Sequence, residues 1–171
     1  LDGAQDYRRA LIKGMKVYHA PLGAAASAAL DAAFARLTGG AAGAPEDLPV
    51  QGRTLTIARA AKGVAMASFA ELCERPLGAA DYGAIAARFH TLILDGVRAL
   101  AEDERDVARR FVTLIDELYE RRAKLICAAA GPPEALYPAG AHAAEFRRAV
   151  SRLHEMQSEG YLGGVGNQSS T

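Results

Sequence analysis

The chain has 171 residues, half of which are hydrophobic, and its 20 basic side chains are balanced by 20 acidic ones. A net charge of zero supplies no global field to attract nucleic acid, so nucleic acid is not expected as a partner. No apolar run of about 18 residues occurs, so neither a transmembrane segment nor a signal peptide is expected, and the predicted location is cytoplasmic.

The first half of the chain predicts a short strand, a helix and a small β element. Residues 16–19 form an extended run before Pro21, and the helix that follows ends at Gly39 and Gly40. Its apolar side chains recur at helical spacing, at Ala26, Leu30, Ala33, Phe34 and Leu37. Residues 41–49 are predicted to be a loop. Alternation around Gln51 predicts a hairpin, and an extended piece at 64–69 completes a small antiparallel element over residues 48–69.

The second half predicts a strand-helix-strand unit over residues 89–129. The apolar run from Leu92 to Leu94 is typical of a strand buried on both faces, and Asp95 and Gly96 are expected to end it. An amphipathic helix from Asp103 leads to a second strand at 124–128, which should lie parallel to the first. With a last helix at 146–157 and a flexible tail at 163–171, the predicted class is α/β, a partial P-loop-type parallel sheet with flanking helices.

Cysteine and histidine show no metal-binding pattern. Cys73 and Cys127 lie far apart without a C-x-x-C partner, which favours two buried thiols in a reducing compartment over a disulfide or zinc framework. The four histidines lack metal-ligand spacing, and no serine lies in G-x-S-x-G. Zinc sites and hydrolase triads therefore find no support, and no metal ligand is predicted.

Asp95 is a candidate because of its place in the predicted sheet. Ligands of parallel sheets bind beyond the carboxyl ends of the strands, where Asp95 and the turn after Ala128 should meet. An apolar strand ending in aspartate also has the form of a Walker B carboxylate that holds magnesium. The next residue is Gly96 rather than the glutamate that would activate water, so a turn-forming carboxylate is the favoured alternative.

Arg148 and Arg152 lie four residues apart on the predicted last helix, flanked by Glu145 and Glu155. Such a stripe is typical of a solvated ladder of weak ion pairs. Arginine is also suited to phosphate, because its planar guanidinium binds two oxygens and keeps its charge. Both interpretations stay open at this point.

A phosphate-binding loop is missing from this sequence. P-loop proteins need G-x-x-x-x-G-K-[ST], in which glycine amides and one lysine close around the phosphate oxygens. None of the four lysines, Lys13, Lys16, Lys62 and Lys124, follows a glycine in such a string. The 171 residues are therefore expected to hydrolyse no ATP alone.

Five ordered stretches carry a family resemblance: VQGRTLTIARAAKGVA, SFAELCERPLGAADY, FHTLILDGV, RRFVTLIDELYERRAKLICAAAGPPEALYP and EFRRAVSRLHEMQS. Together they resemble the ZapE-type cell-division ATPases, P-loop AAA+ proteins related to a mitochondrial ATPase, over nearly the whole chain. The resemblance implies that residues 1–162 are the C-terminal part of a AAA+ ATPase domain. The Walker A loop, the Walker B acids and the sensor asparagine would then precede Leu1.

The resemblance also implies function and candidate residues. ATP and Mg²⁺ would be bound through the missing N-terminal half, in a homo-oligomer that remodels a protein partner of the division apparatus at the division site. The family motif matches Arg148, Ser151, Arg152, Glu155 and Met156, and it makes the two arginines candidates for sensing nucleotide. A rival hypothesis is a stand-alone interaction module derived from such an ATPase, without catalytic activity.

Overall fold

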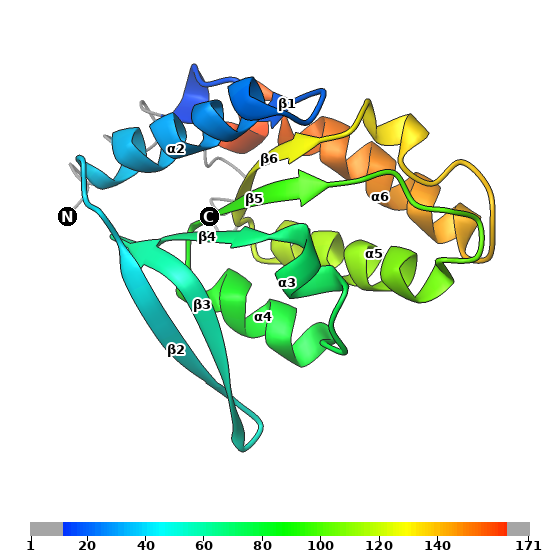
Figure 1. Ribbon diagram of the computed structural model, residues 1–171, viewed down its shortest axis with the longest axis horizontal. Helices are drawn as coiled ribbons and strands as arrows, with labels where there is room; N and C mark the ends of the chain where they lie inside the picture. Colours follow the sequence, from blue (N-terminus) through cyan, green and yellow to red (C-terminus); the bar gives the residue numbers. More distant parts are fainter. Residues whose placement is uncertain (1–11, 164–171) are drawn as a thin grey trace.

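Six strands form one sheet at the centre of the computed structural model, which describes residues 12–163 (Figure 1). They are β1 (Tyr18–His19), β2 (Ala44–Val50), β3 (Arg53–Ala61), β4 (Val64–Ser68), β5 (Thr91–Val97) and β6 (Lys124–Ala129). Their spatial order is β1-β6-β5-β4-β3-β2. The first four strands of that order are parallel, and β3 and β2 continue the sheet antiparallel. The predicted α/β class is confirmed.

Helices cover both faces of this sheet. Helix α2 (Ala24–Thr38) packs on β4, β5 and β6 from one side. On the other side lie α3 (Phe69–Cys73), α4 (Ala79–Arg88) and α5 (Arg105–Glu120), as Figure 1 shows. Helix α6 (Ala143–Met156) packs against α5 and the 3-10 turn η1 (Pro133–Ala135), and α7 (Glu159–Leu162) follows it. The sheet is thus the middle layer, which explains why β5 and β6 consist almost entirely of buried residues.

The predicted strand-helix-strand unit is confirmed as β5, α5 and β6. Leu92 lies opposite Leu125 and Ile93 opposite Ile126 in a parallel ladder. Helix α5 buries the apolar stripe that its sequence predicts and returns the chain to the start of β6. The predicted apolar face of α2 is likewise buried from Ala26 to Leu37.

The predicted loop at 41–49 is wrong from Ala44 onward, where strand β2 begins. β2 is one of the two edge strands of the sheet, and Leu48 and Val50 are its buried residues. Prolines are tolerated on such an edge, because an edge strand leaves some of its N–H groups unpaired. Pro45 lies where the register with β3 shifts, and Pro49 pairs with Thr54. The prolines and acidic residues of β2 are typical of a loop, and the segment is a strand because it pairs with β3.

The β element at 48–69 is continuous with the parallel sheet. β4 pairs antiparallel with β3 on one side and parallel with β5 on the other. The strand ends at Ser68, one residue earlier than predicted, because Ser68 caps α3 through a hydrogen bond from the Glu71 backbone N–H to its hydroxyl.

The prediction that Asp95 and Gly96 end the first parallel strand is also wrong. β5 continues to Val97 through an irregularity in the register, since Leu94 lies opposite Cys127 and Val97 opposite Ala129. Gly96 has a φ of 77°, a conformation in which glycine is favoured and the strand bends without ending. The tail predicted at 163–171 lies outside the described residues except for Gly163.

Candidate functional site

Asp95 lies near the carboxyl edge of the sheet and is partly buried. Its Oδ2 accepts a hydrogen bond of 3.0 Å from the hydroxyl of Ser27, which belongs to the first turns of α2. The carboxylate therefore ties the bend in β5 to the helix above it. Among residues 12–163, no group of three histidine, cysteine or acidic side chains could hold a metal ion.

The turn after β6 is fixed by β1 rather than left open. The hydroxyl of Tyr18 donates a 2.7 Å hydrogen bond to the carbonyl of Gly131, and burial raises the pKa of this phenol. The last residues of β6 are alanines with no polar side chain to present. At the carboxyl ends of β5 and β6, where sequence analysis placed a candidate site, the structure thus has hydrogen bonds that stabilise the fold.

Arg148 and Arg152 both contact one carboxylate of the neighbouring helix. Asp116 on α5 accepts from Arg152 Nη1 at 2.6 Å and from Arg148 Nη2 at 3.4 Å. Arg152 also contacts Glu120, whose Oε2 lies 3.8 Å from Arg152 Nη2. The ion pairs of these two arginines among the described residues thus cross from α6 to α5. These pairs differ from the ladder with Glu145 and Glu155, one of the two interpretations of the sequence, because the sequence of one helix does not show which acids its neighbour presents.

Tyr119 completes this contact between the helices. The guanidinium of Arg152 lies over the Tyr119 ring, 4.6 Å from its centroid, a cation–π geometry. The Tyr119 hydroxyl donates to Glu155 at 2.8 Å, and this hydrogen bond raises the pKa of the phenol. Sequence analysis missed Asp116 and Tyr119. Their signal is that 116, 119 and 120 share one helix face, as do 148, 152 and 155 on the partner helix.

The two arginines differ in what they can still bind. The side chain of Arg152 is 23% exposed and that of Arg148 is 52% exposed. Arg152 would have to leave Asp116 and Tyr119 to reach a ligand, whereas the contact of Arg148 with Asp116 is long, at 3.4 Å. Arg148 is therefore the better candidate for meeting phosphate, and Arg152 the better candidate for positioning α6.

The structure does not bring Asp95 and the arginine pair together. Asp95 bonds to α2 on one face of the sheet, whereas the arginines bond to α5, which covers the other face (Figure 1). The candidate residues belong to two places in the fold, and no single site in the described chain unites them.

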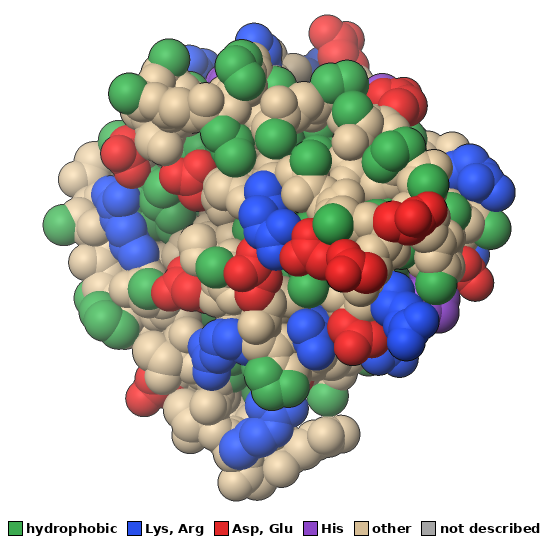
Figure 2. Space-filling model, turned by 45° about the vertical axis from the view of Figure 1, so that its right-hand side comes forward, with side chains coloured by type: hydrophobic (Ala, Val, Ile, Leu, Met, Phe, Trp, Pro, Cys, Tyr) green, Lys and Arg blue, Asp and Glu red, His purple; other side chains and the backbone are tan. Residues whose placement is uncertain are grey.

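Arg98, on the loop after β5, is the centre of a denser charge cluster. Its guanidinium donates to both carboxylate oxygens of Glu104 at 2.9 and 2.8 Å, and its Nε donates to Glu74 at 2.7 Å. The Arg98 hydrogen bonds lower the pKa of Glu104 to about 2. On the side of the molecule drawn in Figure 2, acidic and basic side chains lie next to one another in this way, so no patch of a single sign dominates that view.

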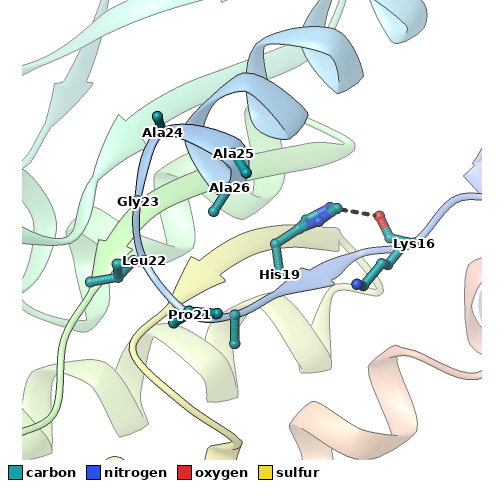
Figure 3. Close-up of a pocket in the computed structure, with 9 residues that line it drawn as sticks. Lys16, His19, Pro21, Leu22, Gly23, Ala24, Ala25 and Ala26 are labelled. Carbon is teal, nitrogen blue, oxygen red and sulfur yellow. Dashed lines mark hydrogen bonds between the residues drawn. The ribbon is translucent and has the colours of Figure 1, made fainter.

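A hollow of about 350 Å³ lies where β1 leads into α2 (Figure 3). It is lined by Lys16, His19 and the run from Ala20 to Ala26, and the His19 ring shares a 3.1 Å hydrogen bond with the Lys16 carbonyl.

No helix in the described part of the chain is long and apolar enough to cross a membrane.

Comparison with known proteins gives a family. The family model described as AFG1-like ATPase matches residues 1–165. Cell division protein ZapE of Escherichia coli (strain K12) is 33% identical over 162 residues, which cover 95% of this chain and 43% of the relative. Lactation elevated protein 1 homolog B of Danio rerio is 36% identical, over 68% of this chain and 30% of the relative. The chain thus spans less than half the length of these relatives. No solved structure matches.

Proposed function

Because the chain belongs to the AFG1-like ATPase family, we propose that it is the C-terminal part of a AAA+ ATPase that couples ATP hydrolysis to remodelling of a protein partner. The observation that carries this proposal is the match of the family model to residues 1–165. A relative named for cell division, 33% identical to this chain in an alignment that covers 95% of it, supports the proposal. The partner would belong to the division machinery and the protein would act in the cytoplasm, at the division site.

ATP and Mg²⁺ are assigned to residues outside this chain. Asp95, the one carboxylate at the strand edge that was a candidate for magnesium, already accepts a hydrogen bond from Ser27. No lysine follows a glycine in a phosphate-binding string anywhere in the 171 residues. The proposed role of this segment is therefore to support a Mg²⁺–ATP site rather than to form one.

Helix α6 is the proposed link to the nucleotide. Arg148 would contact phosphate held by another part of the protein or by a neighbouring subunit of a homo-oligomer, as arginines do in other phosphoryl-transfer sites. Arg152 would hold α6 in place through Asp116 and Tyr119. This assignment rests on exposure: the half-exposed guanidinium of Arg148 has free N–H groups to offer.

The proposal is tested by phosphate release from the purified 171-residue chain in ATP and Mg²⁺. The expected rate equals that of a blank without protein, and circular dichroism with a cooperative thermal transition shows that the chain is folded. A longer protein in which an ATPase module precedes residue 1 is expected to hydrolyse ATP. Turnover by residues 1–171 alone would overturn the proposal.

A stand-alone interaction module is the second candidate. The observation that favours it is that the described sheet has a continuous buried core and a carboxyl edge closed by structural hydrogen bonds. Such a module would bind its partner in buffer without nucleotide and would leave ATP hydrolysis by other proteins unchanged. A part of an ATPase should instead restore hydrolysis when it is joined to the upstream module.

A further inference from the structure

The carboxylate of Asp116 contacts both α6 arginines, and it binds them unequally. Asp116 belongs to α5, the helix that lies beside α6 (Figure 1). Its Oδ1 accepts a hydrogen bond from Arg152 at 2.6 Å, whereas its Oδ2 lies 3.4 Å from Arg148 Nη2. The first distance is that of a strong charge-assisted hydrogen bond, and the second is longer than the usual range of about 2.7–3.2 Å. Because each arginine has its own oxygen, the contact with Arg148 can break while the bond to Arg152 remains.

Exposure to solvent differs between the two arginines in the same direction. The side chain of Arg148 is half-exposed, whereas that of Arg152 is less exposed and lies over the ring of Tyr119. An exposed guanidinium with a long contact gains little free energy from its partner, because water competes for the same N–H groups. The contact of Arg148 with Asp116 is therefore one that a stronger anion can replace.

Other arginines of the described chain are bound more firmly. Arg98 donates to both carboxylate oxygens of Glu104, at 2.9 and 2.8 Å. Arg53 donates to both oxygens of Asp81, at 2.5 and 2.9 Å. A competing anion would have to replace two short hydrogen bonds in each of these pairs, and it would have to replace one long contact at Arg148.

We propose that Asp116 restrains Arg148 in the absence of nucleotide and releases it to phosphate, while it keeps Arg152 and therefore α6 in place. The inference rests on the proposed function, because it requires that Arg148 is the residue that meets phosphate. It goes further by assigning the regulation of that contact to a carboxylate of α5. Asp116 touches no phosphate in this role, so it is a positioning residue.

The exchange is favourable because phosphate is the better partner for a guanidinium. A phosphate group offers two oxygens that the planar guanidinium of Arg148 can meet at once, whereas Asp116 offers it one oxygen at 3.4 Å. While Arg148 contacts Asp116, it is unavailable to nucleotide. The apparent Kd for nucleotide then equals the intrinsic Kd divided by the fraction of molecules in which Arg148 is released. Removing the restraint should therefore tighten nucleotide binding.

Helix α6 has other contacts that remain after the exchange. When Arg148 leaves, Arg152 keeps its 2.6 Å bond to Asp116 and its position over the Tyr119 ring. Its Nη2 also lies 3.8 Å from Glu120 Oε2. The exchange therefore frees one guanidinium and should leave the packing of α6 on α5 unchanged.

The test measures the affinity for AMP-PNP with Mg²⁺ in the longer, active protein by isothermal titration calorimetry. Asp116→Asn preserves the size of the side chain and one acceptor oxygen, which should stay on Arg152, and it removes the charge that restrains Arg148. The Kd for AMP-PNP should fall about threefold to fivefold, the factor that corresponds to one exposed ion pair. A cooperative thermal transition shows that the variant is folded.

Two controls separate the restraint from a general effect of charge. Glu120→Gln removes the same charge from α5 beside Arg152, and it should change the Kd less than about 1.5-fold. In an Arg148→Ala background, Asp116→Asn should also change the Kd less than about 1.5-fold, because no guanidinium is left to release. A merely structural role of Asp116 would alter the affinity in both backgrounds.

A second measurement needs no variant at Asp116. In nuclear magnetic resonance spectra of the 171-residue chain, the Nε–H signals of Arg148 and Arg152 are assigned with the variants Arg148→Lys and Arg152→Lys. Excess tripolyphosphate should shift the signal of Arg148 and leave that of Arg152 unchanged. Equal shifts of both signals, or no shift of the Arg148 signal, would overturn the inference.

Failure of the inference and failure of the proposed function give different results. The inference is overturned if Asp116→Asn leaves the Kd unchanged, weakens binding, or tightens it equally in the Arg148→Ala background. The proposed contact of Arg148 with phosphate fails instead if Arg148→Ala alone leaves both the Kd for AMP-PNP and ATP hydrolysis unchanged.

Discussion

Arg53 and Asp81 form a bidentate ion pair that links the β2–β3 hairpin to α4. The Arg53 Nη atoms lie 2.5 and 2.9 Å from the two carboxylate oxygens. The Asp81 side chain is 1% exposed and also accepts from the Gly78 backbone N–H at 2.9 Å. A carboxylate that is buried and fully hydrogen-bonded in this way makes the first turn of α4 depend on the hairpin.

Replacing this aspartate should destabilise the fold clearly. Asp81→Ala removes three hydrogen bonds, two from Arg53 and one from Gly78. The expected loss in the free energy of unfolding is about 2–3 kcal/mol, measured by urea denaturation. Glu46→Ala is the matched control, because its more exposed pair with Arg88 joins the same two elements and should cost less than about 1 kcal/mol. Equal losses would contradict a special role for Asp81.

The same pair predicts a pH dependence. The Arg53 hydrogen bond holds the pKa of Asp81 below its ordinary value of about 4. A carboxyl whose pKa is lowered on folding stabilises the fold above its unfolded pKa and loses that contribution as the pH falls through its folded pKa. The stability difference between the natural chain and Asp81→Asn should therefore be constant at neutral pH and shrink below about pH 4. A difference independent of pH down to about pH 2 would contradict the assignment.

Much of the fold could be predicted because the patterns that specify it are local. The apolar runs of β5 and β6 predict buried strands, the stripe of α5 predicts a helix that covers a sheet, and together they predict that the two strands are parallel, as the ladder between them is. Strand β2 could not be found this way. Its prolines and acids are typical of a loop, and it is a strand because β3 supplies the hydrogen bonds.

The candidate site was less predictable, because its contacts are distant in sequence. Arg148 and Arg152 were found, but Asp116 lies 36 residues from Arg152 and Ser27 lies 68 residues from Asp95. A single sequence shows which residues share a helix face, and it does not show which faces meet. The partners that decide whether these residues bind a ligand or support the fold therefore appear only in three dimensions.

Arg152 and Arg148 should separate stability from activity. Arg152→Ala removes a 2.6 Å ion pair and a ring contact, so it should lower the free energy of unfolding by about 1–2 kcal/mol. Arg148→Ala should cost less than about 0.5 kcal/mol, since its contact with Asp116 is long and exposed. Arg152→Lys should restore only part of the loss, because an ammonium lacks the planar face that stacks on Tyr119.

The same variants test the proposed nucleotide contact in the longer, active protein. Arg148→Ala should reduce hydrolysis by about 10²-fold with an unchanged melting temperature. Arg152→Ala should reduce hydrolysis as strongly while also lowering the melting temperature. Unchanged ATP hydrolysis in both variants would mean that the two arginines stabilise the packing of α6 and do not contact nucleotide.

Asp95 and Ser27 should behave as one unit. If the carboxylate serves the contact between β5 and α2, Ser27→Ala and Asp95→Ala should each destabilise the chain, and the double variant should cost less than the sum. The expected coupling is about 0.5–1.5 kcal/mol by urea denaturation. Additive losses would show that the hydrogen bond contributes nothing, and Asp95 would again be a candidate for ligand binding.

The two cysteines should be inert in the folded chain. Both are free and buried, as the sequence predicts, and burial raises the pKa of Cys73 and of Cys127 to about 12. Because the thiolate is the reactive form, labelling by a disulfide reagent at about pH 8 should be slowed at least about 10³-fold relative to an ordinary thiol with a pKa near 8.5. Both should react at the ordinary rate in urea, which controls for reagent quality. Rapid labelling of either cysteine in the folded protein would show that β6 or α3 opens readily, and it would contradict the closed core from which the other predictions proceed.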